Sequence, residues 1–82
     1  METVGEEVAV LARFEGGRLV PLRFRWEGRT YVVGRVTSAW SVREGAHRNR
    51  HFSVVANTGS FYEISFRPAG MRWVLEKRGL EG

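Results

Sequence analysis

Residues 18–43 read RLVPLRFRWEGRTYVVGRVTSAWSVR, and this stretch decides the fold class. At its centre, large apolar residues alternate with arginines in the order Leu22, Arg23, Phe24, Arg25 and Trp26. Strict alternation over several residues is typical of a strand with one buried face. Glu27-Gly28 interrupts the alternation as a tight turn would, and an apolar run, YVV, resumes it at positions 31–33. The stretch therefore predicts a β-hairpin followed by a long bent strand.

The bend is predicted at Gly34, a lone glycine inside an otherwise strand-like run. Such a glycine indicates a β-bulge or a sharp change of direction, which lets one sheet curl onto itself. Beyond it, β-branched and aromatic residues dominate positions 35–43 and favour a continued strand. A short helix over residues 37–44, with Val36 and Trp40 one turn apart, is the alternative that the sequence leaves open.

Turn signals divide the whole chain into six short strands. These strands are expected at residues 8–14, 19–26, 30–43, 51–57, 61–66 and 71–76. The turns between them contain glycine, proline or asparagine, which supply the backbone angles that turns require. Pro21 cannot donate a backbone hydrogen bond, so it is expected near the start of its strand or at a sheet edge. Residues 44–50, EGAHRNR, are polar and basic and are predicted to form a loop.

No helix of three turns is visible, so we predict an all-β domain. Six strands at roughly 8–12-residue spacing are typical of a small antiparallel barrel or a strongly curled sheet, and both SH3-like and OB-like barrels fit the size. The 82 residues suffice for one domain, 1–82, whose polar ends, 1–7 and 78–82, are expected to fray. The expected core is Leu22, Phe24, Trp26, Tyr31, Val33, Trp40, Val54, Tyr62, Ile64, Trp73 and Leu75.

Composition narrows the class of protein further. Five Phe, three Trp and two Tyr supply the dense core that a small domain needs, and the absence of cysteine excludes disulfides and thiolate metal sites. Neither a signal peptide nor an apolar run of roughly 18 residues is present, so we expect a cytoplasmic protein with no membrane partner. The charged residues are almost all Arg and Glu, as in thermophiles or GC-rich genomes, and the net charge of +4 permits an anionic partner.

No group of residues in the sequence has the pattern of a catalytic or metal site. His47 and His51 would share a face of a helix, but His47 falls in the predicted loop and His51 directly follows it, no third ligand is near, and we interpret both as exposed. No serine has a Gly-x-Ser-x-Gly setting, no glycines form a phosphate-binding loop, and the glutamates are scattered as on a solvated surface. We therefore predict a protein that is not an enzyme and that uses no cofactor and no metal.

The arginines indicate a different kind of site. Arg23 and Arg25 point away from the apolar face of their strand, and Arg48 and Arg50 lie in the polar loop. If the barrel brings the basic residues into one stripe, they would contact a nucleic-acid backbone, because arginine can bind phosphate oxygens two at a time. The predicted nucleic-acid-binding residues are Arg23, Arg25, Arg35, Arg43, Arg48, Arg50 and, as a stacking platform for bases, Phe61. The alternatives are ordinary Arg–Glu surface pairs and, for Phe61, a second core layer.

Two segments resemble a family of short bacterial domains of unknown function. They are PLRFRWEGRTYVVGRV at 21–36, followed by Trp40, and YEISFRPAGMRWVLEK at 62–77. The shared pattern is a proline, an alternating strand that ends in Trp, a small turn, and a closing Arg-Trp before a hydrophobic pair, over most of residues 14–77. Some actinobacterial members are encoded near genes for error-prone DNA polymerases, so the resemblance implies a link to DNA repair and no catalytic residues. The segment EGAHRNRH at 44–51 departs from the family, in which aromatic residues are common there.

We therefore expect a non-enzymatic binding module that is associated with nucleic acid, either DNA or RNA, or that assists DNA repair. The alternative is a domain that binds another protein or a second copy of itself, through an exposed strand edge or an apolar patch near Phe61. Salt distinguishes the two, since phosphate contacts weaken steeply as salt rises and an apolar interface does not.

Overall fold

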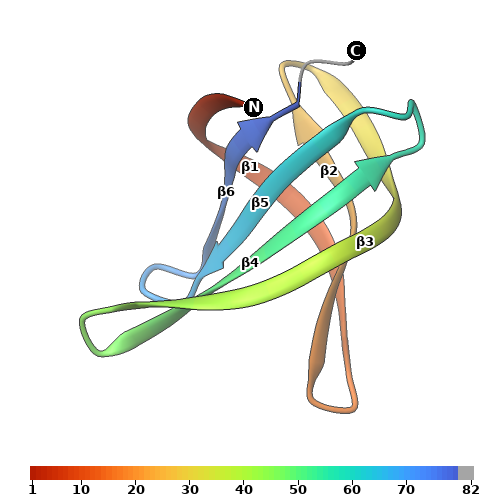
Figure 1. Ribbon diagram of the computed structural model, residues 1–82. Helices are drawn as coiled ribbons and strands as arrows, with labels where there is room; N and C mark the ends of the chain where they lie inside the picture. Colours follow the sequence, from red (N-terminus) through yellow and green to blue (C-terminus); the bar gives the residue numbers. More distant parts are fainter. Residues whose placement is uncertain (80–82) are drawn as a thin grey trace.

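The computed structural model describes residues 1–79, which form an all-β barrel, as the sequence predicts (Figure 1). The strands are β1 (Glu2–Glu15), β2 (Arg18–Trp26), β3 (Arg29–Glu44), β4 (His47–Ala56), β5 (Phe61–Arg67) and β6 (Arg72–Arg78). Each strand pairs antiparallel with the next along the chain, and β6 pairs with β1 to close the barrel. The described part of the chain contains no helix that is long and apolar enough to cross a membrane.

β1 is longer than the predicted strand at 8–14 and is shared between two neighbours. Residues 2–8 pair with β6 and residues 9–15 pair with β2. The register with β6 shifts around Gly5, whose φ of +69° lies in the left-handed region that favours glycine. A bulge of this kind bends a strand, and here it lets β1 pass from one neighbour to the other while the barrel closes.

The bend predicted at Gly34 is confirmed as a bulge in β3. The register with β4 shifts at Gly34, where an added Cβ would lie 3.2 Å from the carbonyl oxygen of Val55. Glycine is favoured here because it lets the two backbones approach closely. β3 nevertheless continues as one strand to Glu44, which excludes the helix considered for residues 37–44.

The loop predicted for residues 44–50 is wrong. The chain turns at Gly45 and Ala46, and β4 begins at once with His47, which pairs directly with Glu44. Gly45 has a φ of +60°, the positive angle that a tight hairpin turn needs at its first central position. Apolar alternation missed this part of β4 because both of its faces carry polar side chains, so no period of two is visible there.

The core between the curved faces of the barrel is mainly aromatic and aliphatic. Its buried hydrophobic residues are Val8, Phe24, Trp26, Phe52, Val54, Ala56, Tyr62, Ile64, Val74 and Leu75. The Phe24 ring is stacked on Tyr31 at 5.2 Å and meets Tyr62 edge-on at 5.2 Å. Most of the predicted core is confirmed as buried; four of its members are half-buried, namely Leu22, Tyr31, Val33 and Trp73.

The predicted burial of Trp40 is wrong, since 39% of its surface is exposed. A second register shift in β3, between Val36 and Ser38, places Trp40 opposite His51 on the outer face of the barrel. Counting by twos from Val36 fails across this shift, because a bulge changes the face to which the following side chains point. The Trp40 ring instead stacks on the His51 imidazole, with 5.5 Å between the ring centres.

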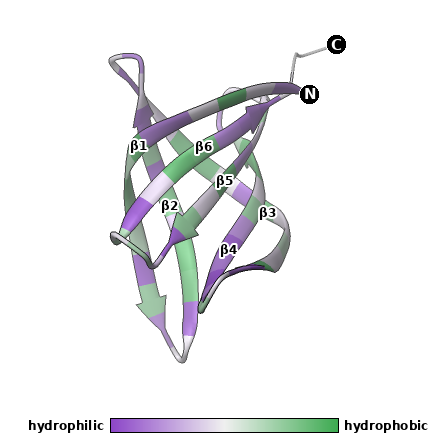
Figure 2. Cartoon of the chain, turned by 90° about the vertical axis from the view of Figure 1, so that its left-hand side faces the viewer, coloured by the Kyte–Doolittle hydropathy of each residue, from purple (hydrophilic) through white to green (hydrophobic). Residues whose placement is uncertain are grey.

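Purple and green bands alternate along several strands in Figure 2, as expected for strands with one face toward a core. The polar N-terminal residues 2–7 belong to β1, and β6 ends at Arg78. The expected fraying of residues 1–7 and 78–79 stays a prediction, because pairing does not measure how often a strand end opens. Residues 80–82 of that prediction lie outside the described residues.

Candidate functional site

Two hairpin arms extend from one end of the barrel (Figure 1). β2 and β3 are paired only between residues 23–26 and 29–32, and the two strands diverge beyond this point. We call residues 12–21 the β1–β2 arm and residues 36–53 the β3–β4 arm. Because no pairing joins β2 to β3 along the arms, a cleft remains between them.

The concave face of the β3–β4 arm is basic. Arg43 and Arg48 are direct cross-strand partners, and Arg50 lies opposite Ser41. Directly opposed residues point to the same face of a sheet, as do residues two apart on one strand. The three arginines therefore share the face that carries the buried Phe52 farther along β4. Within residues 1–79, no ion pair involves any of these three arginines.

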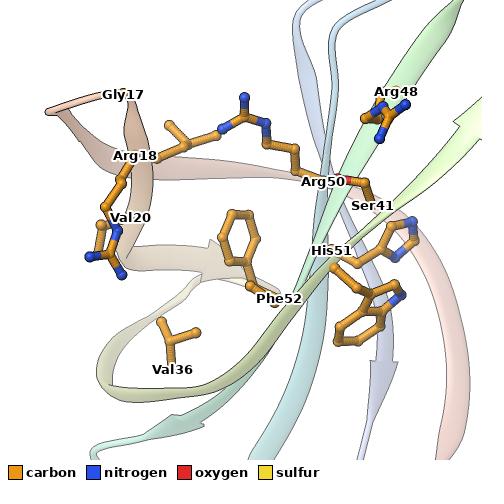
Figure 3. A pocket seen from close by; sticks show the side chains of 12 residues that line it. Gly17, Arg18, Val20, Val36, Ser41, Arg48, Arg50, His51 and Phe52 are labelled. Carbon is orange, nitrogen blue, oxygen red and sulfur yellow. The ribbon is translucent and has the colours of Figure 1, made fainter.

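The first of two cavities at these arginines, which we call the gap cavity, lies between the arms and has a volume of about 410 Å³. Residues 17–20 line it on the β1–β2 arm, and Arg48, Arg50 and Phe52 are among its lining residues on the other arm. Figure 3 shows the Arg50 side chain extending from β4 toward the β1–β2 arm. The cavity thus combines an apolar floor with cationic side chains.

The second, which we call the mouth cavity, lies between the β1–β2 arm, the tip of the β3–β4 arm and the turn that joins β5 to β6, and has a volume of about 500 Å³. Its wall is apolar and includes Phe14, Phe66 and Met71, and it shares Arg48 and Arg50 with the gap cavity. Phe14 and Met71 are 70% and 75% exposed, respectively. Large apolar side chains of this exposure beside unpaired arginines form a surface that a ligand with both apolar faces and negative charge would cover.

The outer face of the β3–β4 arm is braced by hydrogen bonds. His51 Nδ1 lies 3.0 Å from Glu63 Oε2, and the Asn49 amide donates a 2.8 Å hydrogen bond to Glu44. The interpretation of His51 as exposed is wrong: its side chain is only 12% exposed, because Trp40 stacks on it and Glu63 adjoins it. Glu44 is the only carboxylate of the arm and is held on this outer face, so the concave face stays basic.

A second group of side-chain hydrogen bonds joins β5 to β6. Glu76 accepts hydrogen bonds of 2.6 Å from Ser65 Oγ and of 2.6 Å from Arg67 Nη2. Burial alone would raise the pKa of the Glu76 carboxyl, but the hydrogen bonds from Arg67 and Ser65 and the Arg67 charge together hold that pKa below its usual value. The interpretation of the glutamates as solvated surface residues is wrong for Glu63 and Glu76, because their side chains are only 13% and 17% exposed.

The structure places the seven predicted site residues in three separate groups. Arg43, Arg48 and Arg50 share the concave face of the β3–β4 arm, and Arg48 and Arg50 line the cleft. Arg23 and Arg25 are exposed on the outer face of β2, where Arg25 Nη1 donates a 3.4 Å hydrogen bond to a threonine hydroxyl. The predicted single stripe is therefore not formed, because these two groups leave the sheet on different faces.

The third group contains Arg35 and Phe61. Val55 pairs with both residues, so the three form one row across the outer face of β3, β4 and β5. Phe61 begins β5 and is 47% exposed, so it is not part of a second core layer. It lies five residues from Phe66, roughly 17 Å along the strand, and so lies far from the arginines of the cleft.

Sequence reasoning missed three residues that border the cleft. Arg18 lines the gap cavity, and Phe14 and Met71 line the mouth cavity. Met71 was expected to begin the last strand, at 71–76, but it lies in the turn before β6 with a φ of +52°. The sequence did carry a signal for two of these residues. Phe14 and Arg18 flank a glycine turn, and side chains near the tip of a hairpin extend beyond the core.

One of three comparisons with known proteins finds a match, and it is to the model of a protein family. The model of a family that is described as a domain of unknown function, DUF6504, matches residues 1–78. No protein with a curated description matches the chain, and no solved structure matches it. A function must therefore be argued from the cleft.

Proposed function

The chain belongs to the DUF6504 family, and we propose that it is a non-enzymatic module that binds single-stranded nucleic acid, DNA or RNA. The observation that carries the proposal is the cleft, in which Arg48 and Arg50 line a cavity together with the exposed Phe14 and Met71, and Arg43 lies beside Arg48 on the same face of the sheet. Proteins that hold single strands combine a basic groove for the backbone with apolar or aromatic platforms for the bases. The cleft has both parts side by side.

The arginines would supply the phosphate contacts. Arg48 and Arg50 lie two residues apart on β4, so their side chains leave the same face of the sheet about 7 Å apart. A guanidinium group can bind two phosphate oxygens at once, and such charge-assisted hydrogen bonds are stronger than neutral ones. Since no carboxylate competes for these groups in the described ion pairs, they are available to an anionic ligand.

The mouth cavity would contact the bases. The exposed Phe14 offers a ring on which a base can stack, and Met71 and the half-buried Phe66, which packs against Trp73, add apolar contacts. In a duplex the base faces are already stacked on each other and are not available to such a wall. The apolar lining therefore supports a single strand as the ligand, whereas arginines alone would serve a duplex equally well.

The setting that we propose is the cytoplasm, with a role as an accessory in DNA repair. Repair exposes single strands, which a small basic module could hold or protect. The support for this setting is the resemblance to bacterial proteins encoded near error-prone DNA polymerase genes, and it is independent of the cleft. The binding proposal therefore does not depend on the repair role.

Fluorescence anisotropy tests the proposal with a labelled oligonucleotide, offered at low salt as a single strand and as a duplex. The expected result is binding of the single strand with higher affinity than the duplex. Absence of binding to either form at low salt would end the proposal. A preference for the duplex would contradict the role assigned to the apolar wall of the mouth cavity.

A protein partner is the second candidate, because β3 has an unpaired edge. Along residues 33–44, β3 is paired with β4 on one side and with no strand of the described residues 1–79 on the other. Unpaired edges are templates for the addition of another strand. The edge offers backbone groups and the concave face offers arginine side chains, so the two candidate functions can be tested with different substitutions.

A further inference from the structure

We infer that the open edge of β3 is a docking site for an extended acidic peptide, which adds to the sheet as a strand in the gap between the two arms. The inference goes beyond the proposed function, because it uses the backbone of β3 rather than the side chains of Arg48 and Arg50. It also concerns a different class of partner.

The direction of the backbone groups on β3 follows from its hairpin. Glu44 and His47 flank a two-residue turn, and such a flanking pair is joined by backbone hydrogen bonds. Hydrogen-bonded and non-hydrogen-bonded pairs alternate along an antiparallel ladder. The N–H and C=O groups of Ala39, Ser41 and Arg43 therefore point away from β4, toward the gap. β2 does not reach them, because it is paired with β3 only near their shared turn.

This edge is well suited to accept a strand. The register between β3 and β4 is regular from Ser38 to Glu44, so the edge presents its backbone groups at even spacing. Native proteins usually block an open edge by keeping it short, by bulging it or by covering it. β3 is 16 residues long, and its register shifts all lie before Ser38. The regular part of the edge is therefore unblocked.

The chemistry of the gap defines the peptide. Its apolar lining includes Leu19, Val36 and Phe52, and its cavity of about 410 Å³ has room for the side chains on one face of a strand. Arg18 lines the same cavity from the opposite arm, and Arg43 lies at the end of the edge. Because the apolar lining and the arginines lie on the same face of the sheet, a strand that carries both apolar and acidic residues on its face toward the cavity would place apolar groups against the lining while its carboxylates meet the arginines.

Two other occupants fit this edge less well. The β3 strand of a second copy carries Arg43 and would bring this cation into a gap that Arg18, Arg48 and Arg50 already line, and like charges placed close together are destabilising. A nucleic acid lacks the evenly spaced amide donors and acceptors that a strand edge pairs with. Charge and backbone chemistry together favour an acidic peptide.

The test uses a labelled synthetic peptide of about ten residues, the upper end of the usual strand length, in which every second residue is Thr and the positions between them alternate Glu with Val, so that Glu and Val share one face. We call it the Glu–Val peptide, and the Lys–Val peptide has Lys in place of each Glu. Ser41→Pro removes an N–H that points into the gap and leaves every arginine in place, and Ser41→Ala is its matched control. We expect the peptide to bind the wild type and Ser41→Ala equally, and Ser41→Pro about tenfold or more weakly, as for the loss of a hydrogen bond in a site shielded from water. A Lys–Val peptide should not bind.

Several results would overturn the inference: no binding of the Glu–Val peptide to the wild type, equal binding to Ser41→Pro, or equal binding of the Lys–Val peptide. Formation of a dimer on gel filtration without peptide would assign the edge to a second copy. Circular dichroism shows whether Ser41→Pro folds. If it does not, two peptides replace the variant, one N-methylated at its odd positions and one at its even positions. Only one of the two should lose binding, because only every second N–H of an added strand points toward β3. If the peptide does not bind the wild type while the oligonucleotide does, this site is rejected and the proposed function stands. If the oligonucleotide does not bind while the peptide does, the proposed function is rejected and this site stands.

Discussion

Arg43 and Arg48 are direct cross-strand partners near the tip of the β3–β4 arm, so two guanidinium groups leave the same face of the sheet side by side. Like charges in this position destabilise a strand pair. Within residues 1–79, no carboxylate pairs with either group. An anion placed between them would relieve the repulsion, which links the stability of the arm to the proposed binding of phosphates.

The first prediction concerns this repulsion. Arg43→Thr should raise the free energy of unfolding by up to about 1 kcal/mol, because it removes one of two opposed like charges and adds a residue that favours strands. Urea denaturation measures the change. Arg23→Thr is the matched control, since Arg23 faces Leu11 and Val32 and no cation. Equal effects of the two substitutions would show that the opposed charges do not matter.

The second prediction concerns the core. Phe24→Ala should lower the free energy of unfolding by about 3–5 kcal/mol, because Phe24 is 1% exposed and packs between two tyrosine rings. Phe14→Ala should change it by no more than about 0.5 kcal/mol, because Phe14 is 70% exposed. Guanidinium denaturation of both variants checks the pair. Similar losses for the two would contradict the core described for this barrel.

The third prediction concerns pH. The folded chain holds the pKa of Glu76 below its unfolded value, so the unfolded state binds the proton first as the pH falls. The stabilisation is therefore complete above the unfolded pKa of about 4.3 and is lost as the pH falls toward the folded pKa. Glu76→Gln should be less stable than the wild type at neutral pH, and this difference should shrink at acid pH. A difference that stays constant between pH 7 and pH 3 would disprove the role given to Glu76.

The fold could be predicted because the decisive segments keep a simple period. The alternation from Leu22 to Trp26 survives in β2, and the lone Gly34 marks the bend that lets the barrel close. Alternation fails where a bulge intervenes, so Trp40 was placed on the wrong face. A bulge changes the facing of every later side chain and leaves little trace in composition.

The site was predicted only in part, for a related reason. Arg43, Arg48 and Arg50 come together because residues that looked like a loop form the polar end of β4. The positions of Phe14 and Met71 depend on how far the two hairpins diverge, which is a property of strand pairing and not of local sequence. Face alternation could place Arg23 and Arg25 on the outer face but could not show that the cleft lies elsewhere.

The measurement that tests the central claim most directly is the salt dependence of single-strand binding by anisotropy, for the wild type, Arg48→Ala/Arg50→Ala and the control Arg23→Ala/Arg25→Ala. The cleft account predicts that the slope of log affinity against log salt falls by about 1.4 in the first variant, since each phosphate contact to a single strand contributes about 0.7. The control should keep the slope of the wild type. An unchanged slope in Arg48→Ala/Arg50→Ala, or an equal fall in both variants, would contradict the claim that the cleft between the arms holds the nucleic-acid backbone.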